Sequence, residues 1–115
     1  MRKLVSIVIP CYRSAQMLCG VVTDIEREME KIRDKYQWEI ILVNDCSPDN
    51  TFEVIRELCR MKKNICGVNL ARNFGQHAAL MAGFHQVKGD ILVCMDDDGQ
   101  TPAFAIKDLL QGLED

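Results

Sequence analysis

The stretch Ile91-Leu92-Val93-Cys94-Met95-Asp96-Asp97-Asp98 joins a short apolar run directly to three consecutive carboxylates. A branched, aliphatic run of this length predicts a buried β-strand. Three like charges at its end repel one another unless a cation or a shell of hydrogen bonds offsets the repulsion. The stretch therefore predicts a strand that delivers carboxylates to a divalent metal and, through the metal, to a phosphorylated ligand.

Strand and helix signals alternate through the rest of the chain. Apolar runs predict three further strands, at residues 4–9, 39–44 and 65–70, with Pro10 ending the first of them. Apolar residues at three- and four-residue steps predict a helix at about 15–35. Further helices are expected at 50–61, at 76–87, where small apolar residues favour a closely packed helix, and from about Thr101 onward. Asn50 is expected to cap the second helix, with Glu53 completing a capping box. The last helix should bury one stripe, made of Ile106, Leu109, Leu110 and Leu113.

The order β-α-β-α-β-α-β-α predicts an α/β fold. Strands joined by helices imply an open, mostly parallel sheet with right-handed crossovers and helices on both faces, which is a Rossmann-like nucleotide-binding architecture. Ligands of such sheets bind at the carboxyl ends of the strands. We therefore expect the polar segments 10–13, 45–47 and 96–98 to meet at one edge of the sheet.

Composition and length favour a single-domain globular protein and argue against some classes of partner. The chain has 115 residues, which fits one domain, and its 48% hydrophobic content allows a modest core. A net charge of -3 without a Lys/Arg-rich run argues against nucleic acid as a partner. No apolar stretch is long enough to span a membrane. Six cysteines without a CxxC pair favour free thiols, Cys94 among them inside a buried strand, and a cytoplasmic location.

Other phosphate-binding and metal-binding patterns fit less well. A dinucleotide fold needs G-x-G-x-x-G after the first strand, and residues 10–15 contain no glycine. A Walker loop is absent, and an EF-hand that starts at Asp96 lacks its glycine and its final glutamate. Two alternatives stay open. One is a haloacid-dehalogenase-like phosphohydrolase with Asp96 as nucleophile, although Gln100 stands where its threonine is expected; the other is a non-catalytic α/β binding module.

A metal-bridged nucleoside diphosphate is the ligand that these loops fit best. Asp96 and Asp98 can both reach one ion where a strand opens into a turn, and Gln100 can add a neutral oxygen. Asp45 can accept a hydrogen bond from an N–H of a base. Tyr12 can pack against that base, with Arg72 beside it.

Four segments carry a family resemblance, at residues 8–12, 43–51, 72–77 and 95–102. In this order, and on these elements, they resemble the family 2 glycosyltransferases with a GT-A fold. The similarity is greatest to the branch that transfers sugars to polyprenyl phosphates, such as dolichyl-phosphate mannose synthase and bactoprenol glucosyltransferases. The resemblance covers essentially the whole chain and implies that it is the nucleotide-sugar-binding part of a GT-A domain.

The resemblance also implies roles for individual residues. Those that hold the substrate, a UDP- or GDP-linked sugar, would be Pro10, Tyr12, Asp45, Arg72, Asp96 and Asp97. Those that hold Mg²⁺ or Mn²⁺ would be Asp96, Asp98 and Gln100. The chain departs from the family pattern at four places: Asn44 replaces the first of a common Asp-Asp pair, Cys46 stands where glycine is usual, Arg13-Ser14 replaces Asn-Glu, and Gly99 is smaller than the apolar residue often found there.

By resemblance, the reaction is an inverting transfer of the sugar to an acceptor, with a polyprenyl or other lipid-linked phosphate as the implied acceptor class. Cell-wall or polysaccharide biosynthesis is the implied setting. Residues 1–115 would be the donor-binding half of a longer chain, and any general base would lie beyond Asp115. We therefore expect these residues alone to have weak or no transferase activity, and the full-length protein to work in the cytoplasm or at the cytoplasmic face of a membrane.

Overall fold

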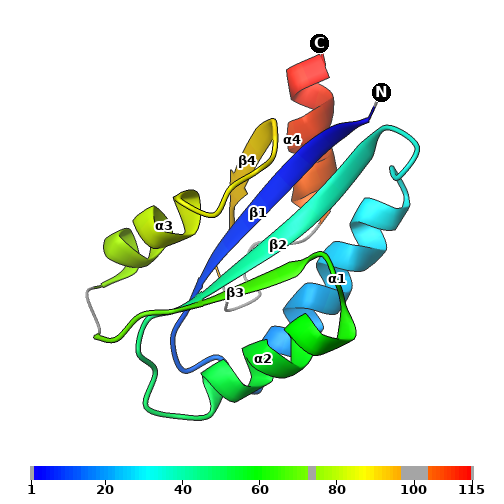
Figure 1. Cartoon of the computed structure of the whole chain (residues 1–115). Coiled ribbons are helices and arrows are strands. Elements are labelled where there is room, and N and C mark those ends of the chain that lie inside the picture. Colours follow the sequence, from blue (N-terminus) through cyan, green and yellow to red (C-terminus); the bar gives the residue numbers. More distant parts are fainter. Residues whose placement is uncertain (1, 73–74, 97–103, 115) are drawn as a thin grey trace.

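Strands and helices alternate along the chain in the computed structural model, which describes residues 2–72, 75–96 and 104–114. The elements are β1 (Lys3–Cys11), α1 (Leu18–Glu30), β2 (Tyr36–Asn44), α2 (Thr51–Met61), β3 (Ile65–Asn69), α3 (Gln76–Phe84), β4 (Ile91–Cys94) and α4 (Phe104–Glu114). Within the described residues the strands form one parallel sheet in the order β3-β2-β1-β4 (Figure 1). This arrangement confirms the predicted α/β fold.

The central strand β1 pairs with β2 on one side and with β4 on the other. It runs through Pro10 to Cys11, so the prediction that Pro10 ends the strand is wrong. The β4 ladder ends where Cys94 lies opposite Val8, and the Met95 N–H donates to the Val8 carbonyl at 3.0 Å. Pro10 lies beyond this paired part of β1, so its missing N–H breaks no ladder bond.

Helices cover both faces of the sheet, as predicted, but unequally (Figure 1). The larger core lies between the sheet and α1, α2 and α4, and it receives Val5, Ile7 and Ile9 from β1. The smaller core lies under α3, which packs over Val8 of β1 and Ile41 of β2. Because β1 and β2 are buried on both faces, their sequences are near-continuous apolar runs.

Several helix and strand boundaries differ from those that the sequence predicts. Helix α1 begins at Leu18 rather than near residue 15, because the Ser14 carbonyl first accepts the N–H groups of Met17 and Leu18, both at 3.0 Å, in a preceding turn. It ends at Glu30, and turns then lead to β2, which starts before residue 39. Helix α3 is also shorter than predicted and ends at Phe84.

The helices in the described part of the chain are short. The longest in the described residues, α1, has 13 residues, whereas a membrane-spanning helix needs about 20 apolar ones. None of the described helices is long and apolar enough to cross a bilayer.

The stripe predicted for α4 is only half correct. Ile106 and Leu110 are buried, but Leu109 and Leu113 are 58% and 68% exposed. The two exposed leucines and residues Ile91–Cys94 of β4 line an open apolar groove at the edge of the sheet. The periodicity of α4 was therefore predicted correctly, but the width of the face that it buries was not.

Cys94 is exposed, so the prediction that it lies buried within its strand is wrong. Strand β4 is an edge strand, and α3 contacts β1 and β2. Cys94 lies beside Val8 and Leu92 lies beside Ser6, on the face that α3 covers only in part. Apolar composition alone did not distinguish this edge strand from the two central ones.

A buried serine fixes the start of β4. The Ser6 hydroxyl donates to Glu39 Oε2 at 2.5 Å and accepts the Gly89 N–H at 2.8 Å. The same carboxylate oxygen accepts the Lys88 N–H at 2.9 Å. These bonds fasten the α3–β4 connection to β1 and β2, and so help to set the register in which β4 runs toward its acidic end.

Gly83 allows α3 to approach the sheet closely, since a Cβ at this position would lie 2.5 Å from Val8 Cγ1 and 3.1 Å from Val43 Cγ2. We expect Gly83→Ala to destabilise the fold by about 1–3 kcal/mol through overpacking, despite the better helix propensity of alanine. The free energy of unfolding in urea measures the effect.

Gly20→Ala is the matched control, because nothing lies within 4 Å of a Cβ added at Gly20 in α1. This change should stabilise the fold by about 0.5–1 kcal/mol. Equal shifts of the same sign in both variants would contradict the close approach of α3.

Candidate functional site

The carboxyl ends of β1 and β2 lie side by side and bring two predicted site residues together (Figure 1). Cys11 and Asn44 are partners at the last position of the ladder, so Tyr12 and Asp45 leave the sheet next to each other. The Asp45 N–H continues the ladder by donating to the Cys11 carbonyl at 3.0 Å. This placement agrees with the expectation that these residues meet at one edge.

The aromatic ring at this edge is partly covered by its neighbour in the sequence. The Arg13 guanidinium carbon lies 5.5 Å from the centroid of the Tyr12 ring, a cation–π distance. The Tyr12 side chain is 41% exposed, which leaves part of the ring accessible to a planar ligand such as a base. Arg13 itself has φ 53°, a left-handed conformation that favours glycine.

Asp45 lies buried beside an asparagine that fastens its loop. Asn44 donates through Nδ2 to Asn69 Oδ1 at 2.8 Å, and its Oδ1 accepts the Ser47 N–H at 3.2 Å. A carboxylate at position 44 would have no hydrogen to donate to Asn69. The departure from the Asp-Asp pair therefore has a structural reason, since an amide can join the end of β3 to the loop after β2.

The turn before α2 is organised by Asp49, a residue that the sequence analysis did not single out. Its Oδ1 accepts hydrogen bonds from the hydroxyls of Ser47 and Thr51, both at 2.5 Å, and from the Thr51 N–H at 3.0 Å. Asn50 makes no side-chain cap bond, so the predicted capping box is wrong. An aspartate that bonds the backbone two residues on is an Asx turn, and that pattern in the sequence is the signal that could have identified Asp49.

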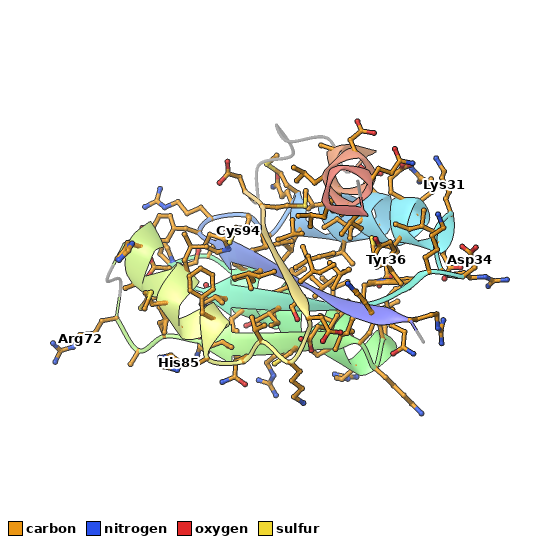
Figure 2. The ribbon with its side chains drawn as sticks, turned by 90° about the horizontal axis from the view of Figure 1, so that it is seen from above. Lys31, Asp34, Tyr36, Arg72, His85 and Cys94 are labelled. Atoms are coloured by element: carbon orange, nitrogen blue, oxygen red, sulfur yellow. The ribbon has the colours of Figure 1, made fainter. Side chains whose placement is uncertain are left out.

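Arg72 follows Ala71, whose carbonyl accepts a hydrogen bond from the Cys46 thiol at 3.6 Å. Arg72 is exposed, and Figure 2 shows its side chain extending outward from the loop after β3. A role for Arg72 beside a bound base stays a prediction.

The acidic end of β4 is only partly within the described residues. Asp96 is exposed, and because Cys94 lies opposite Val8 in a parallel pair, Asp96 leaves the sheet at the same edge as Tyr12. Asp97, Asp98 and Gln100 lie outside the described residues. Within residues 2–72, 75–96 and 104–114, no three His, Cys, Asp or Glu side chains form a metal-binding group. The metal ligands therefore stay predictions, although carboxylate and amide oxygens are the donors that Mg²⁺ and Mn²⁺ prefer.

Comparison with known proteins gives one family over nearly the whole chain. The sequence pattern of the family described as "Glycosyl transferase family 2" matches residues 6–115. Two bacterial relatives are undecaprenyl-phosphate 4-deoxy-4-formamido-L-arabinose transferases, from Aeromonas hydrophila (38% identical over 110 residues) and Pectobacterium carotovorum (41% over 111 residues). The alignments cover 95% of this chain, and the chain spans 33% of the length of each relative.

Solved structures share the fold. The mannosyltransferase PcManGT from Pyrobaculum calidifontis, in complex with GDP-Man and Mn²⁺, superposes with a TM-score of 0.73 at 25% identity, over 85% of this chain and 28% of its own. S. aureus TarS 1-349, in complex with UDP-GlcNAc, superposes with a TM-score of 0.74 at 19% identity, over 99% of this chain and 31% of its own. The second likeness is one of fold alone.

The hydrogen bonds that the Asp49 carboxyl accepts predict a pH dependence of the stability of the fold. Hydrogen bonds from the Ser47 hydroxyl, and then from the Thr51 hydroxyl, hold the pKa of Asp49 below its ordinary value of 3.8. A carboxyl whose pKa is lowered by folding stabilises the fold above its unfolded pKa, and this contribution is lost as the pH falls through the folded pKa. We therefore expect wild type to be more stable than Asp49→Asn near neutral pH, and the difference to shrink on acidification.

Urea unfolding of both proteins over a series of pH values measures this difference. The same series with Glu57→Gln, which neutralises an exposed acid paired with Arg60 at 3.2 Å on α2, is the control. A gap between wild type and Asp49→Asn that stays constant from neutral pH to well below 3.8 would contradict the role of the ionised carboxyl.

Proposed function

The chain belongs to glycosyl transferase family 2, and from this premise we propose that it binds a nucleoside-diphosphate sugar whose sugar is transferred to an acceptor. The single observation that carries the proposal is the meeting of Tyr12 and Asp45 at the carboxyl edge of a GT-A sheet. Ligands bind at this edge in open parallel sheets. An aromatic ring and a buried carboxylate there suit the face and the N–H groups of a base.

The donor would lie between the ends of β1, β2 and β4. Tyr12 would pack against the base, and Asp45 would accept a hydrogen bond from it. Asp96 and Asp97 would face the rest of the substrate. The complex of PcManGT with GDP-Man supports a nucleoside-diphosphate sugar as the ligand class.

We propose that Asp96, Asp98 and Gln100 hold a divalent cation, Mg²⁺ or Mn²⁺. The donor set is hard and anionic, and the PcManGT complex contains Mn²⁺. When bound, the cation offsets the negative charge that develops on the departing nucleoside diphosphate. Asp96 comes from the strand next to β1, so the same edge would hold both the base and the diphosphate.

We propose a lipid-linked phosphate as the acceptor class. Two of the relatives are named as transferases that use undecaprenyl phosphate, and this supports a lipid-linked phosphate as the acceptor. Such an acceptor is already anionic, so it needs less help from a general base than a hydroxyl does. A phosphohydrolase that uses Asp96 as nucleophile is not favoured, because the family match and the named relatives are glycosyltransferases.

Titration of the chain with UDP and with GDP, in the presence and absence of Mn²⁺, tests the proposal. We expect binding of one nucleotide to require Mn²⁺ and to weaken about tenfold or more in Asp98→Ala, because a metal ligand is lost. Isothermal titration calorimetry gives the affinities and also identifies the base.

Asp34→Ala is the matched control, since Asp34 is an exposed acid in the turn before β2, at the opposite end of that strand from Asp45. The affinity of Asp34→Ala for the nucleotide should equal that of wild type. Failure of wild type to bind either nucleotide with Mn²⁺ would refute the proposal. Hydrolysis of a phosphate ester that Asp96→Asn abolishes would instead favour the phosphohydrolase.

A further inference from the structure

Two residues with left-handed backbone lie at the candidate site, each directly after a residue proposed to bind the base. Arg13 has φ 53° and follows Tyr12, and Cys46 has φ 52° and follows Asp45. For a residue other than glycine this conformation is unfavourable, because Cβ approaches the following carbonyl oxygen. Such strain persists where surrounding contacts hold the backbone in place.

Two side-chain hydroxyls of the second loop accept N–H groups of the first. Arg13 donates its N–H to Ser47 Oγ at 2.9 Å, and Ser14 donates its N–H to Thr51 Oγ1 at 3.0 Å. Ser14 is buried, and its own hydroxyl has no partner among the described residues. The bond from its N–H to Thr51 therefore fixes the position of Ser14 relative to the second loop. These bonds join segments that are 34 and 37 residues apart in the sequence.

A single carboxylate oxygen controls both of these bonds. Asp49 Oδ1 accepts the hydroxyl hydrogens of Ser47 and Thr51 at 2.5 Å. Each hydroxyl donates to Asp49 and so turns its lone pairs toward the N–H group of the other loop. Hydrogen bonds to an ionised acceptor are strong, and bonds in such a chain reinforce one another.

We propose that Asp49 is a positioning residue, whose carboxylate sets the spacing between Tyr12 and Asp45 and thereby the affinity for the nucleoside. This inference rests on the proposed function. Asp49 is exposed and lies outside both hydrophobic clusters, so its removal leaves the packing of the core unchanged. The backbone bond from Asp45 to Cys11 stays in place without it. Loss of Asp49 should therefore loosen the loops rather than unfold the chain.

Nucleotide titration of Asp49 variants tests the inference, with UDP and GDP in the presence of Mn²⁺ as the probes. We expect Asp49→Ala to weaken binding about tenfold, because both cross-loop acceptors lose their orientation. Asp49→Asn keeps one neutral oxygen and should restore part of the affinity. Glu57→Ala removes an exposed carboxylate from α2 and should bind as wild type does.

Two further measurements separate positioning from a general loss of stability. Thermal unfolding gives a temperature at which every variant is fully folded, and affinities are compared at that temperature. Amide hydrogen exchange of the free protein should become faster at Arg13 and Ser14 in Asp49→Ala, while Val8 and Ile41, in the smaller core, stay protected. Ser47→Ala should weaken binding too, and should add little to Asp49→Ala, because both changes remove the same bond.

Each outcome decides a separate point. Wild type that binds neither nucleotide refutes the proposed function, and the inference with it. Wild type that binds while Asp49→Ala binds equally well overturns the inference alone, as do unchanged exchange rates at Arg13 and Ser14. Should Asp49→Ala not fold, Ser47→Ala and Asp49→Asn carry the same comparison, and affinities equal to wild type in both would overturn it.

Discussion

The parallel pairing of β1 with β2 is the constraint on which the rest of this structure depends. The two strands pair over nine positions, from Lys3 opposite Tyr36 to Cys11 opposite Asn44. Because both strands run the same way and stop together, the residues that follow them must leave the sheet at one edge. Residues far apart in the sequence thus become neighbours, with β4 adding the acidic end from the other side of β1.

Two residues at this edge have a left-handed backbone conformation, which is unfavourable for residues other than glycine. The left-handed conformation at Arg13 is offset by bonds that cross between the loops after β1 and β2, and the Cys46 thiol donates to the Ala71 carbonyl, after β3, at 3.6 Å. Asn44 extends this support to β3, since its carbonyl accepts the Leu70 N–H at 2.9 Å and its side chain bonds to Asn69. The loops at the strand ends are therefore joined by hydrogen bonds, whereas the layers below them are joined by apolar packing. Irregular backbone at a ligand-binding edge is typical of sites that need fixed geometry.

The elements that could be predicted are those with a strong local signal. Continuous apolar runs gave β1 and β2, and three- and four-residue spacing gave α1. The errors lie where tertiary contacts decide between similar local alternatives. Leu109 and Leu113 continue the period of α4 but lie on a side that no described element covers. Pro10 would end a strand paired fully on both sides, yet β1 continues, because β4 stops short of it.

The sequence by itself determined the order of strands and helices, the family, and the identity of the polar residues at the strand ends. These follow from short-range patterns and from motifs that are read along the chain. Only the tertiary structure decided that the turn before α2, which Asp49 organises, holds the loop after β1. The physical reason is that a hydroxyl or a carboxylate has several partners of similar energy within its own loop. The choice among them is made by the N–H groups of a second loop, which the sheet brings within hydrogen-bonding distance.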